Sequence, residues 1–210
     1  MRSDPLYVEL PRLETNTEQE RAFEGMWRRL AHGGSYDLDE PGHAFLRWLV
    51  ATEPVLLHGS NRTDLEVFEP RNQADYAGVP VRAVFATSDG VWPIYFAIAD
   101  RRVVRSLIND CVHDGGIARY FFSIATVPED AAPWTSGTVY VLPRAPFRIS
   151  HGSTEWLSRT RIHPLARLPI EPVDFPFLGV VHRHAPDESE PALHARLRAE
   201  LRDAQRDNAA

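Results

Sequence analysis

Helical spacing of apolar residues dominates the N-terminal part of the chain. A helix is expected to begin at Thr17, because Glu20 follows it at the spacing of a capping box. Its buried face should consist of the apolar residues that recur at the helical period: Phe23, Met26, Trp27 and Leu30. Gly33 and Gly34 should end this helix. A second helix is expected over residues 41–51, with Phe45, Trp48 and Leu49 buried.

Short apolar runs predict strands in the middle of the chain. The first expected strand covers residues 55–60 and the second covers 81–87, and the stretch 61–82 has the composition of a loop. Residues 87–89, with the sequence Thr-Ser-Asp, form an N-cap cluster. A buried, aromatic-rich helix should therefore follow over residues 91–99, with a proline tolerated in its first turn.

The pattern becomes mainly β after Gly115 and Gly116. Residues 101–114 fit the helical and the strand period equally well. Strands are expected near 119–125, 138–142, 147–150 and 162–170. The tail over 191–206 predicts a helix with a narrow stripe of Leu193, Leu197 and Leu201, which should pack on the domain or on a partner.

The order of these elements indicates an α+β fold, because helices come first and mixed helices and strands follow. We expect three consecutive parts. They are an N-terminal helical extension over residues 1–52 packed on the core, a core over 53–186, and a C-terminal helix and tail over 187–210.

Charge and cysteine content remove several functional classes. All 23 basic residues among the 210 are Arg, so the chain has no Lys for a Schiff base or for a Walker-A phosphate site. The net charge of −6 argues against a nucleic-acid-binding surface, and a single Cys111 cannot form an intrachain disulfide or a Cys-based zinc site. The N-terminus does not have the pattern of a signal peptide, and no apolar run approaches the length of a membrane helix. We expect a cytoplasmic, bacterial protein.

The segment His58-Gly59-Ser60 is the most informative candidate for chemistry. His58 can donate and accept hydrogen bonds, Gly59 allows a ligand to approach the backbone closely, and Ser60 adds a hydroxyl group. Trp92 and Tyr95 share one face of the following helix, although aromatic residues at this spacing are more often core. A histidine, a bare backbone edge and an aromatic wall suit a flat heteroaromatic ligand that carries a sugar.

Three sequence blocks carry a resemblance to a known family. The block Leu56-Leu57-His58-Gly59-Ser60 resembles the first strand of ADP-ribosyltransferases of the diphtheria-toxin and poly(ADP-ribose) polymerase type. The block Val84-Phe85-Ala86-Thr87, which leads into residues 91–99, is similar to the second motif of that family. The segment from Gly137 to Pro143, with Phe147, resembles a β segment of the small rifamycin-type bacterial transferases. The blocks follow one another in the family order over residues 53–150.

The resemblance implies a mixed β-sheet core, an enzyme that uses NAD as a substrate, and the transfer of ADP-ribose without a metal. It implies that His58 binds the NAD ribose and that the backbone of Gly59 holds the nicotinamide amide. It further assigns Phe85 to the position of a stacking Tyr. From its place on the aromatic helix face, we take Tyr95 as a second aromatic contact. Ser60 and Thr87 are implied as further contacts.

The family also needs a carboxylate that steadies the oxocarbenium-like transition state or activates the acceptor. Arg148 follows Phe147 where such an acid is expected, so the nearest candidates are Glu155 and then Glu129. We take Glu155 as the catalytic candidate beside His58. The sequence leaves the acceptor and the oligomeric state open. The chain also contains a second copy of the His-Gly-Ser triplet, at 151–153.

Three functions are compatible with these residues. The first is ADP-ribosyl transfer from NAD to a protein, a nucleic acid or a small molecule. The second is a related enzyme resembling RNA 2′-phosphotransferases, which requires Arg62, Arg71 or Arg82 to converge on a phosphate. The third is a non-catalytic ligand-binding or interaction module that uses its helical N-terminus and tail. His58 itself is equally well interpreted as a strand-end residue satisfied by backbone groups.

The remaining candidates are interpreted as structural. His182 and His184 should lie on one strand face, as metal ligands sometimes do, but no third ligand stands at a recognisable spacing. No metal is therefore predicted. Cys111 is expected to be buried and inert, because His113 alone does not make a nucleophilic pair.

Overall fold

The chain divides into two compact units that are interleaved along the sequence. The computed structural model describes residues 4–75, 77–114, 117–150 and 154–207. Unit 1 comprises residues 1–12, 100–133 and 177–210, and unit 2 comprises residues 13–99 and 134–176. The three parts predicted from the sequence are consecutive segments of the chain, whereas each of the two units consists of segments that are separated in the sequence. Helices beside two sheets make the described chain an α+β protein, as predicted.

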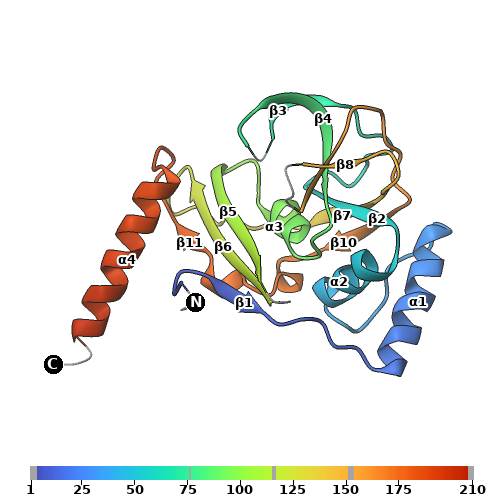
Figure 1. The fold of residues 1–210 in the computed structure, drawn as a ribbon, viewed down its shortest axis with the longest axis horizontal. Helices are drawn as coiled ribbons and strands as arrows, with labels where there is room; N and C mark the ends of the chain where they lie inside the picture. The colour runs from blue at the N-terminus through green and yellow to red at the C-terminus, as the bar shows by residue number, and fades with distance from the viewer. Residues whose placement is uncertain (1–3, 76, 115–116, 151–153, 208–210) are drawn as a thin grey trace. The chain divides into compact units, whose positions relative to one another are not determined.

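Unit 2 contains an antiparallel sheet (Figure 1) with the strand order β10-β7-β2-β4-β9-β8, and β3 pairs with the first half of β4. The strands are β2 (Val55–Ser60), β3 (Arg71–Ala74), β4 (Pro80–Thr87), β7 (Gly137–Pro143), β8 (Arg148–Ile149), β9 (Glu155–Ser158) and β10 (Ala166–Ile170). The strand β2, which carries His58, therefore lies inside the sheet between β7 and β4. Its backbone groups are held along its length by β7.

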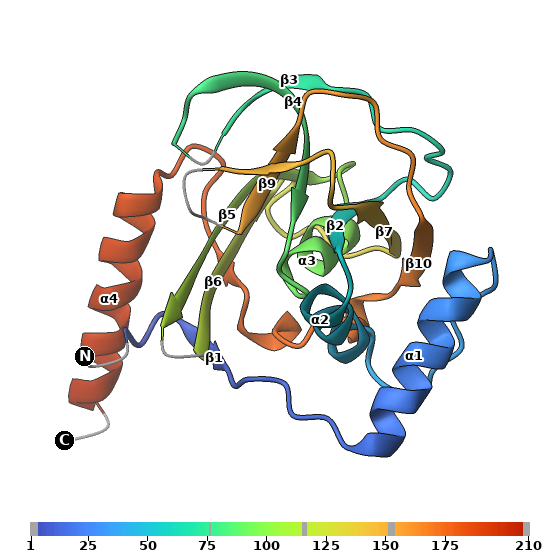
Figure 2. The ribbon, with the colours of Figure 1, turned by 45° about the vertical axis from the view of Figure 1, so that its right-hand side comes forward.

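Three helices of unit 2 accompany this sheet. They are α1 (Thr17–Ala31), α2 (Gly42–Thr52) and α3 (Trp92–Ile98), and a short 3₁₀ turn, η1, covers Pro172–Asp174. Helix α3 packs against β2 and β7, α2 packs against β2, and α1 contacts α2 and β10 (Figure 2). Three members of the apolar face predicted for α1 are buried, namely Phe23, Met26 and Leu30, and the fourth, Trp27, is partly exposed. The second helix buries Phe45, Trp48 and Leu49 as expected.

The other face of the sheet in unit 2 holds a separate hydrophobic cluster. Its buried members are Leu56, Phe68, Val84, Ala86, Tyr140, Leu142, Phe147 and Ile162. Residues 61–70 contribute Phe68 to this cluster, and backbone hydrogen bonds between Phe68 and Ile162 fix its position. The hydroxyl of Tyr140 donates to the Arg62 carbonyl at 2.8 Å and accepts from the Leu65 amide at 3.0 Å. Two tethers therefore hold this loop over the sheet.

Unit 1 is a mixed sheet with one long helix. Its strands are β1 (Val8–Leu10), β5 (Val104–Asp114), β6 (Ile117–Thr126) and β11 (His182–Arg183), and the helical segments are η2 (Leu178–Val180) and α4 (Glu190–Asp207). Strands β1 and β5 pair antiparallel with β6, and β11 pairs parallel with it. Leu193 and Leu197 of α4 are buried with Leu6 and Phe121, and the partly buried Leu201 packs against the same cluster. The predicted leucine stripe is confirmed.

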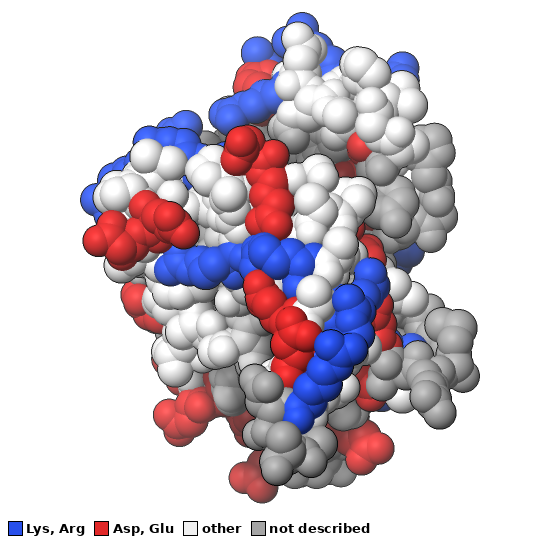
Figure 3. All heavy atoms as spheres, turned by 90° about the vertical axis from the view of Figure 1, so that its left-hand side faces the viewer, with Lys and Arg blue, Asp and Glu red and all other residues white. Residues whose placement is uncertain are grey.

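The outer surface of α4 is charged, with acidic and basic side chains interspersed (Figure 3). Arg196 pairs with Glu188 and Glu200, and Arg198 pairs with Asp4. These ion pairs place opposite charges next to one another, so the outer surface of α4 has no extended patch of one charge sign.

The predicted capping box of the first helix is displaced by one residue. Asn16, not Thr17, is the N-cap, and its side-chain oxygen accepts from the amides of Glu18 at 3.0 Å and Gln19 at 2.9 Å. The side chain of Gln19 accepts in return from the Asn16 amide at 3.2 Å. Asn is as good a cap as Thr, and Gln completes the box as well as Glu, so the sequence offered two registers.

Two stretches of the β regions differ from the prediction, and one that the sequence left open is resolved as a strand. The segment 61–82 contains β3, whose four residues are all exposed, so no apolar alternation marked it. The ambiguous segment 101–114 contains β5, and the strand predicted over 162–170 is regular only over β10. Helix α3 lies where it was predicted, and the Asp89 carboxylate accepts from the amides of Val91 and Trp92 at its start. No helix in the described ranges is long and apolar enough to cross a membrane.

Candidate functional site

His58 lies half-buried on the face of the sheet that residues 61–70 cover. Its Nδ1 is 2.7 Å from the carbonyl oxygen of Phe85, which requires Nδ1 to carry the proton and to donate. The Phe68 ring meets the imidazole nearly edge-on, with centroids 4.8 Å apart. Since Nδ1 is the donor, the neutral ring has a lone pair on Nε2 that can accept a hydrogen bond from a hydroxyl group, and no partner of Nε2 is found among the described residues.

The surroundings of His58 favour the neutral imidazole. Burial lowers the pKa of His58 below its usual value, the hydrogen bond to Phe85 acts in the opposite direction, and the positive charge of Arg71 lowers it further. A neutral imidazole suits a binding role. It cannot serve as a general acid at neutral pH.

Gly59 is in contact with α3. A Cβ atom added at Gly59 would lie 1.8 Å from the carbonyl oxygen of Pro93 and 2.9 Å from the amide nitrogen of Ala97. No L side chain fits there, so glycine is needed for the helix to approach the strand. We expected this glycine to let a ligand approach the backbone. On the face of the strand that packs against α3 this is wrong, because the backbone of α3 occupies the space.

The pairing register separates His58 from Glu155. Leu57 stands opposite Thr87, and Thr87 stands opposite Glu155. Directly opposite residues of antiparallel strands project from the same face, whereas neighbours along a strand project from opposite faces. Leu57, Thr87 and Glu155 therefore share one face, and His58 projects from the other. The sheet lies between the predicted ribose ligand and the predicted carboxylate.

The predicted aromatic contacts are also apart from His58. Phe85 is two residues from Thr87 along β4, so its side chain projects from the face of Thr87, and only its carbonyl reaches His58. Tyr95 is fully buried and stacks on Phe175 with ring centroids 5.6 Å apart. Tyr95 is thus a core residue of unit 2, the more common role for an aromatic side chain at helical spacing.

The two predicted hydroxyl contacts have partners within the chain. Ser60 Oγ accepts from the amide of Arg62 at 3.1 Å. Thr87 Oγ1 donates to the Thr154 carbonyl at 3.0 Å and accepts from the Asp89 amide at the same distance. Both hydroxyls organise turns at the ends of their strands.

The arginines required by a phosphate-handling enzyme do not converge. Arg62 is held by Asp64, with Nε 3.1 Å from the carboxylate. Arg71 stands next to Asn72 in β3, and Asn72 is opposite Arg82, so Arg71 and Arg82 project from opposite faces. Of the three, Arg71 is the one whose charge acts on His58.

The residues considered as metal ligands or as a nucleophile, His182, His184 and Cys111, lie in unit 1. No group of three or more His, Cys, Asp or Glu residues in the described ranges is arranged to hold a metal ion. His182 stacks on Phe121 at 5.3 Å, and His184 contacts Ser123, two residues further along β6. The two histidines thus share a face, as predicted. Cys111 is partly exposed, not buried as expected. The second His-Gly-Ser triplet, at 151–153, lies outside the described residues.

Sequence reasoning missed the loop that encloses His58. Phe68 belongs to the stretch 61–82, which was predicted only as a loop, and its ring forms one wall of the histidine environment. The run of Leu65, Val67 and Phe68 in an otherwise polar segment was the available signal. Searches against protein-family models, curated proteins and solved structures find no match to this chain.

Proposed function

We propose that this chain is a non-catalytic binding module with a fold resembling that of ADP-ribosyltransferases, and that it does not cleave NAD. The observation that carries the proposal is the contact between the Pro93 carbonyl and Gly59. The resemblance assigns the Gly59 backbone to the nicotinamide amide. With α3 packed directly on this glycine, a flat ring cannot lie against that face of the strand.

The register of the sheet supports the same proposal. Cleavage of the bond between nicotinamide and ribose requires a carboxylate on the side where the ribose is bound, because the stabilising charge must face the developing cation. Glu155 projects from the face opposite to His58. The remaining predicted acid, Glu129, belongs to unit 1. Among the described residues of unit 2, neither acid predicted from the sequence therefore stands on the His58 face of the sheet.

The family resemblance itself concerns the order of elements. The strand with His58, the strand with Phe85, the helix α3 and the strand β7 occur in the predicted order, and β7 and β4 both pair with β2. This arrangement is compatible with an inherited transferase core. In this chain the first turn of α3, which contains Trp92 and Pro93, lies against Gly59. NAD as a substrate, an acceptor and transferase chemistry are then properties of the resembled family and not of this chain.

The test is nicotinamide release from NAD by the full-length protein. We expect no release above the rate in buffer, and no shift of the melting temperature at millimolar NAD, because the nicotinamide position is filled. An active NAD-cleaving enzyme in the same assay controls for detection. Release that is lost in both His58→Ala and Glu155→Gln, but kept in the surface variant Glu18→Gln, would overturn the proposal and establish NAD-dependent transfer or hydrolysis.

A further inference from the structure

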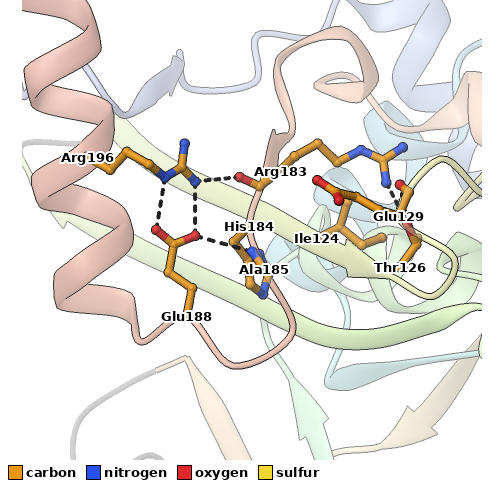
Figure 4. Close-up of a pocket in the computed structure, with 8 residues that line it drawn as sticks. All are labelled: Ile124, Thr126, Glu129, Arg183, His184, Ala185, Glu188 and Arg196. Carbon is orange, nitrogen blue, oxygen red and sulfur yellow. Dashed lines mark hydrogen bonds and ion pairs between the residues drawn. The ribbon is translucent and has the colours of Figure 1, made fainter.

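Unit 1 contains a cavity that none of the functional assignments above uses. Its volume is about 510 Å³, within the range of small-molecule sites. It is bordered by the end of β6, by β11 and by the turn that leads into α4 (Figure 4). Two aliphatic side chains, Ile124 and Ala185, form part of its lining, and the other members are polar or charged.

One charged pair of the lining is fully engaged within the protein. Arg196 donates to both carboxylate oxygens of Glu188, at 2.9 and 3.0 Å, and also to Glu200 at 2.9 Å and to the carbonyl of Arg183 at 2.9 Å. A bidentate pair with additional hydrogen bonds is geometrically fixed. These interactions raise the pKa of Arg196 and lower the pKa of Glu188. Arg196 and Glu188 therefore form a rigid wall and have little capacity left for a ligand.

Two other lining charges are not engaged with each other. Arg183 is exposed and donates one hydrogen bond to Thr126 Oγ1 at 3.1 Å, and within the described ranges it makes no ion pair. The Glu129 carboxylate has no hydrogen bond or ion pair to any side chain that the structure describes. A guanidinium and a carboxylate thus border one cavity without neutralising one another.

His184 contributes a buried ring to the lining of the cavity. Its side chain is buried, with 6% of its surface exposed, and Nδ1 lies 2.8 Å from Ser123 Oγ. Nε2 is buried and has no hydrogen-bond partner among the described residues. Burial lowers the pKa of His184, so the ring is neutral, and in either tautomer Nε2 can make one hydrogen bond. Because Nε2 is closed to a group the size of a water molecule, His184 lines the cavity through its other atoms.

We propose that this cavity binds an α-amino acid with an apolar side chain. Its carboxylate is held by Arg183, its ammonium group by Glu129, and its side chain lies over Ile124 and Ala185. A simple anion would be repelled by Glu129, and a simple cation by Arg183. A ligand with both charges is favoured by both residues. All of these residues belong to unit 1, so the proposal holds whether or not the chain cleaves NAD.

Matched ligands separate a zwitterion from its two halves. The probes for isothermal titration calorimetry on the full chain are leucine and phenylalanine, with 3-methylbutylamine and 4-methylpentanoate as the analogues of leucine that lack one charge. We expect saturable binding of at least one amino acid and binding that is at least about tenfold weaker for both analogues, because each loses a charge-assisted hydrogen bond. Absence of saturable binding for both amino acids at millimolar concentration overturns the proposal. Equal affinity for 4-methylpentanoate also overturns it.

Variants of the two exposed charges test the assignment of residues. Arg183→Gln and Glu129→Gln should each weaken amino-acid binding at least about tenfold. The matched controls are Asp130→Asn, the neighbour of Glu129 that does not line the cavity, and Arg202→Gln on the exposed surface of α4. Both controls should bind like the wild type. Binding that survives in both lining variants contradicts the proposed site.

Discussion

Two histidines, one in each unit, show opposite relations between sequence pattern and environment. His58 stands in a recognisable motif, and the structure encloses it between a backbone carbonyl and the Phe68 ring. His184 stands in no motif that predicts chemistry, and it borders a cavity with charged residues. Both rings use Nδ1 for an internal hydrogen bond. The two rings differ in their surroundings, because His58 lies against the Phe68 ring, whereas His184 lies beside a cavity that Arg183 and Glu129 also line.

A binding site therefore depends on which polar groups are left without partners. Around His58, the predicted contacts Ser60 and Thr87 are satisfied by backbone groups, and Gly59 is covered by α3. Around His184, Arg183 and Glu129 retain most of their hydrogen-bonding capacity. A polar group that has already exchanged water for a protein partner gains little by binding a ligand.

The largest effect is expected at Gly59. The variant Gly59→Ala places a methyl group against the Pro93 carbonyl oxygen and the Ala97 amide nitrogen. Because both of these atoms belong to the backbone of α3, the helix must shift. We expect the free energy of unfolding to fall by about 3 kcal/mol. The measurement is urea-induced unfolding of the two purified proteins.

A second glycine serves as the control for this prediction. Gly25 lies inside α1 with nothing within 4 Å of an added Cβ, so Gly25→Ala should stabilise the protein by about 0.5–1 kcal/mol. If Gly59→Ala proves as stable as the wild type, the space beside β2 is open. A flat ring could then reach the Gly59 backbone, and His58 would no longer differ from His184 in its access to a ligand.

Much of the fold could be predicted from the sequence where apolar periodicity was strong. Helices α1, α2, α3 and α4 were expected close to their actual bounds, as were β2 and β4. Strand β3 was not predictable, because its exposed residues Arg71, Asn72, Gln73 and Ala74 carry no hydrophobic signal and form a strand through pairing with β4. Strand β9 was missed because it is short and follows a segment rich in polar residues.

The site was less predictable than the fold, because it depends on register. The motif places His58 and Phe85 on neighbouring strands, but only the pairing of Leu57 with Thr87 decides which side chains share a face. A shift by one residue reverses that assignment for a whole strand. The cavity of unit 1 joins Glu129 to residues more than fifty positions later in the chain. No local pattern reports such a contact.

An intermediate effect is expected from Ser123, the internal partner of His184. Ser123 is fully buried, so Ser123→Ala leaves the imidazole Nδ1 without a partner in the protein. We expect a loss of about 2 kcal/mol in the free energy of unfolding. Ser35→Ala, at an exposed position, should change stability by less than about 0.5 kcal/mol. If Ser123→Ala leaves the free energy of unfolding unchanged, water replaces the hydroxyl group. The surroundings of His184 are then less closed than those of His58.

The smallest and most gradual effect is the dependence of stability on pH. Burial lowers the pKa of His58 and His184 in the folded state, and also that of His43 and His182, from a usual value of 6.5. A lowered pKa means that the unfolded chain binds protons first, so this stability is complete above pH 6.5 and is lost as the pH falls through the folded-state values. The carboxylates with shifted pKa values titrate below this window, because their usual values of 3.8 to 4.5 are lowered further.

Unfolding free energies measured between about pH 7 and pH 5 should therefore decrease steadily with falling pH. His184→Gln should reduce the slope of this decrease, since it removes one of the four groups. His58→Gln should reduce it as well, because both rings are held neutral by burial. Equal slopes for the wild type and both variants would show that neither histidine is held neutral in the folded protein.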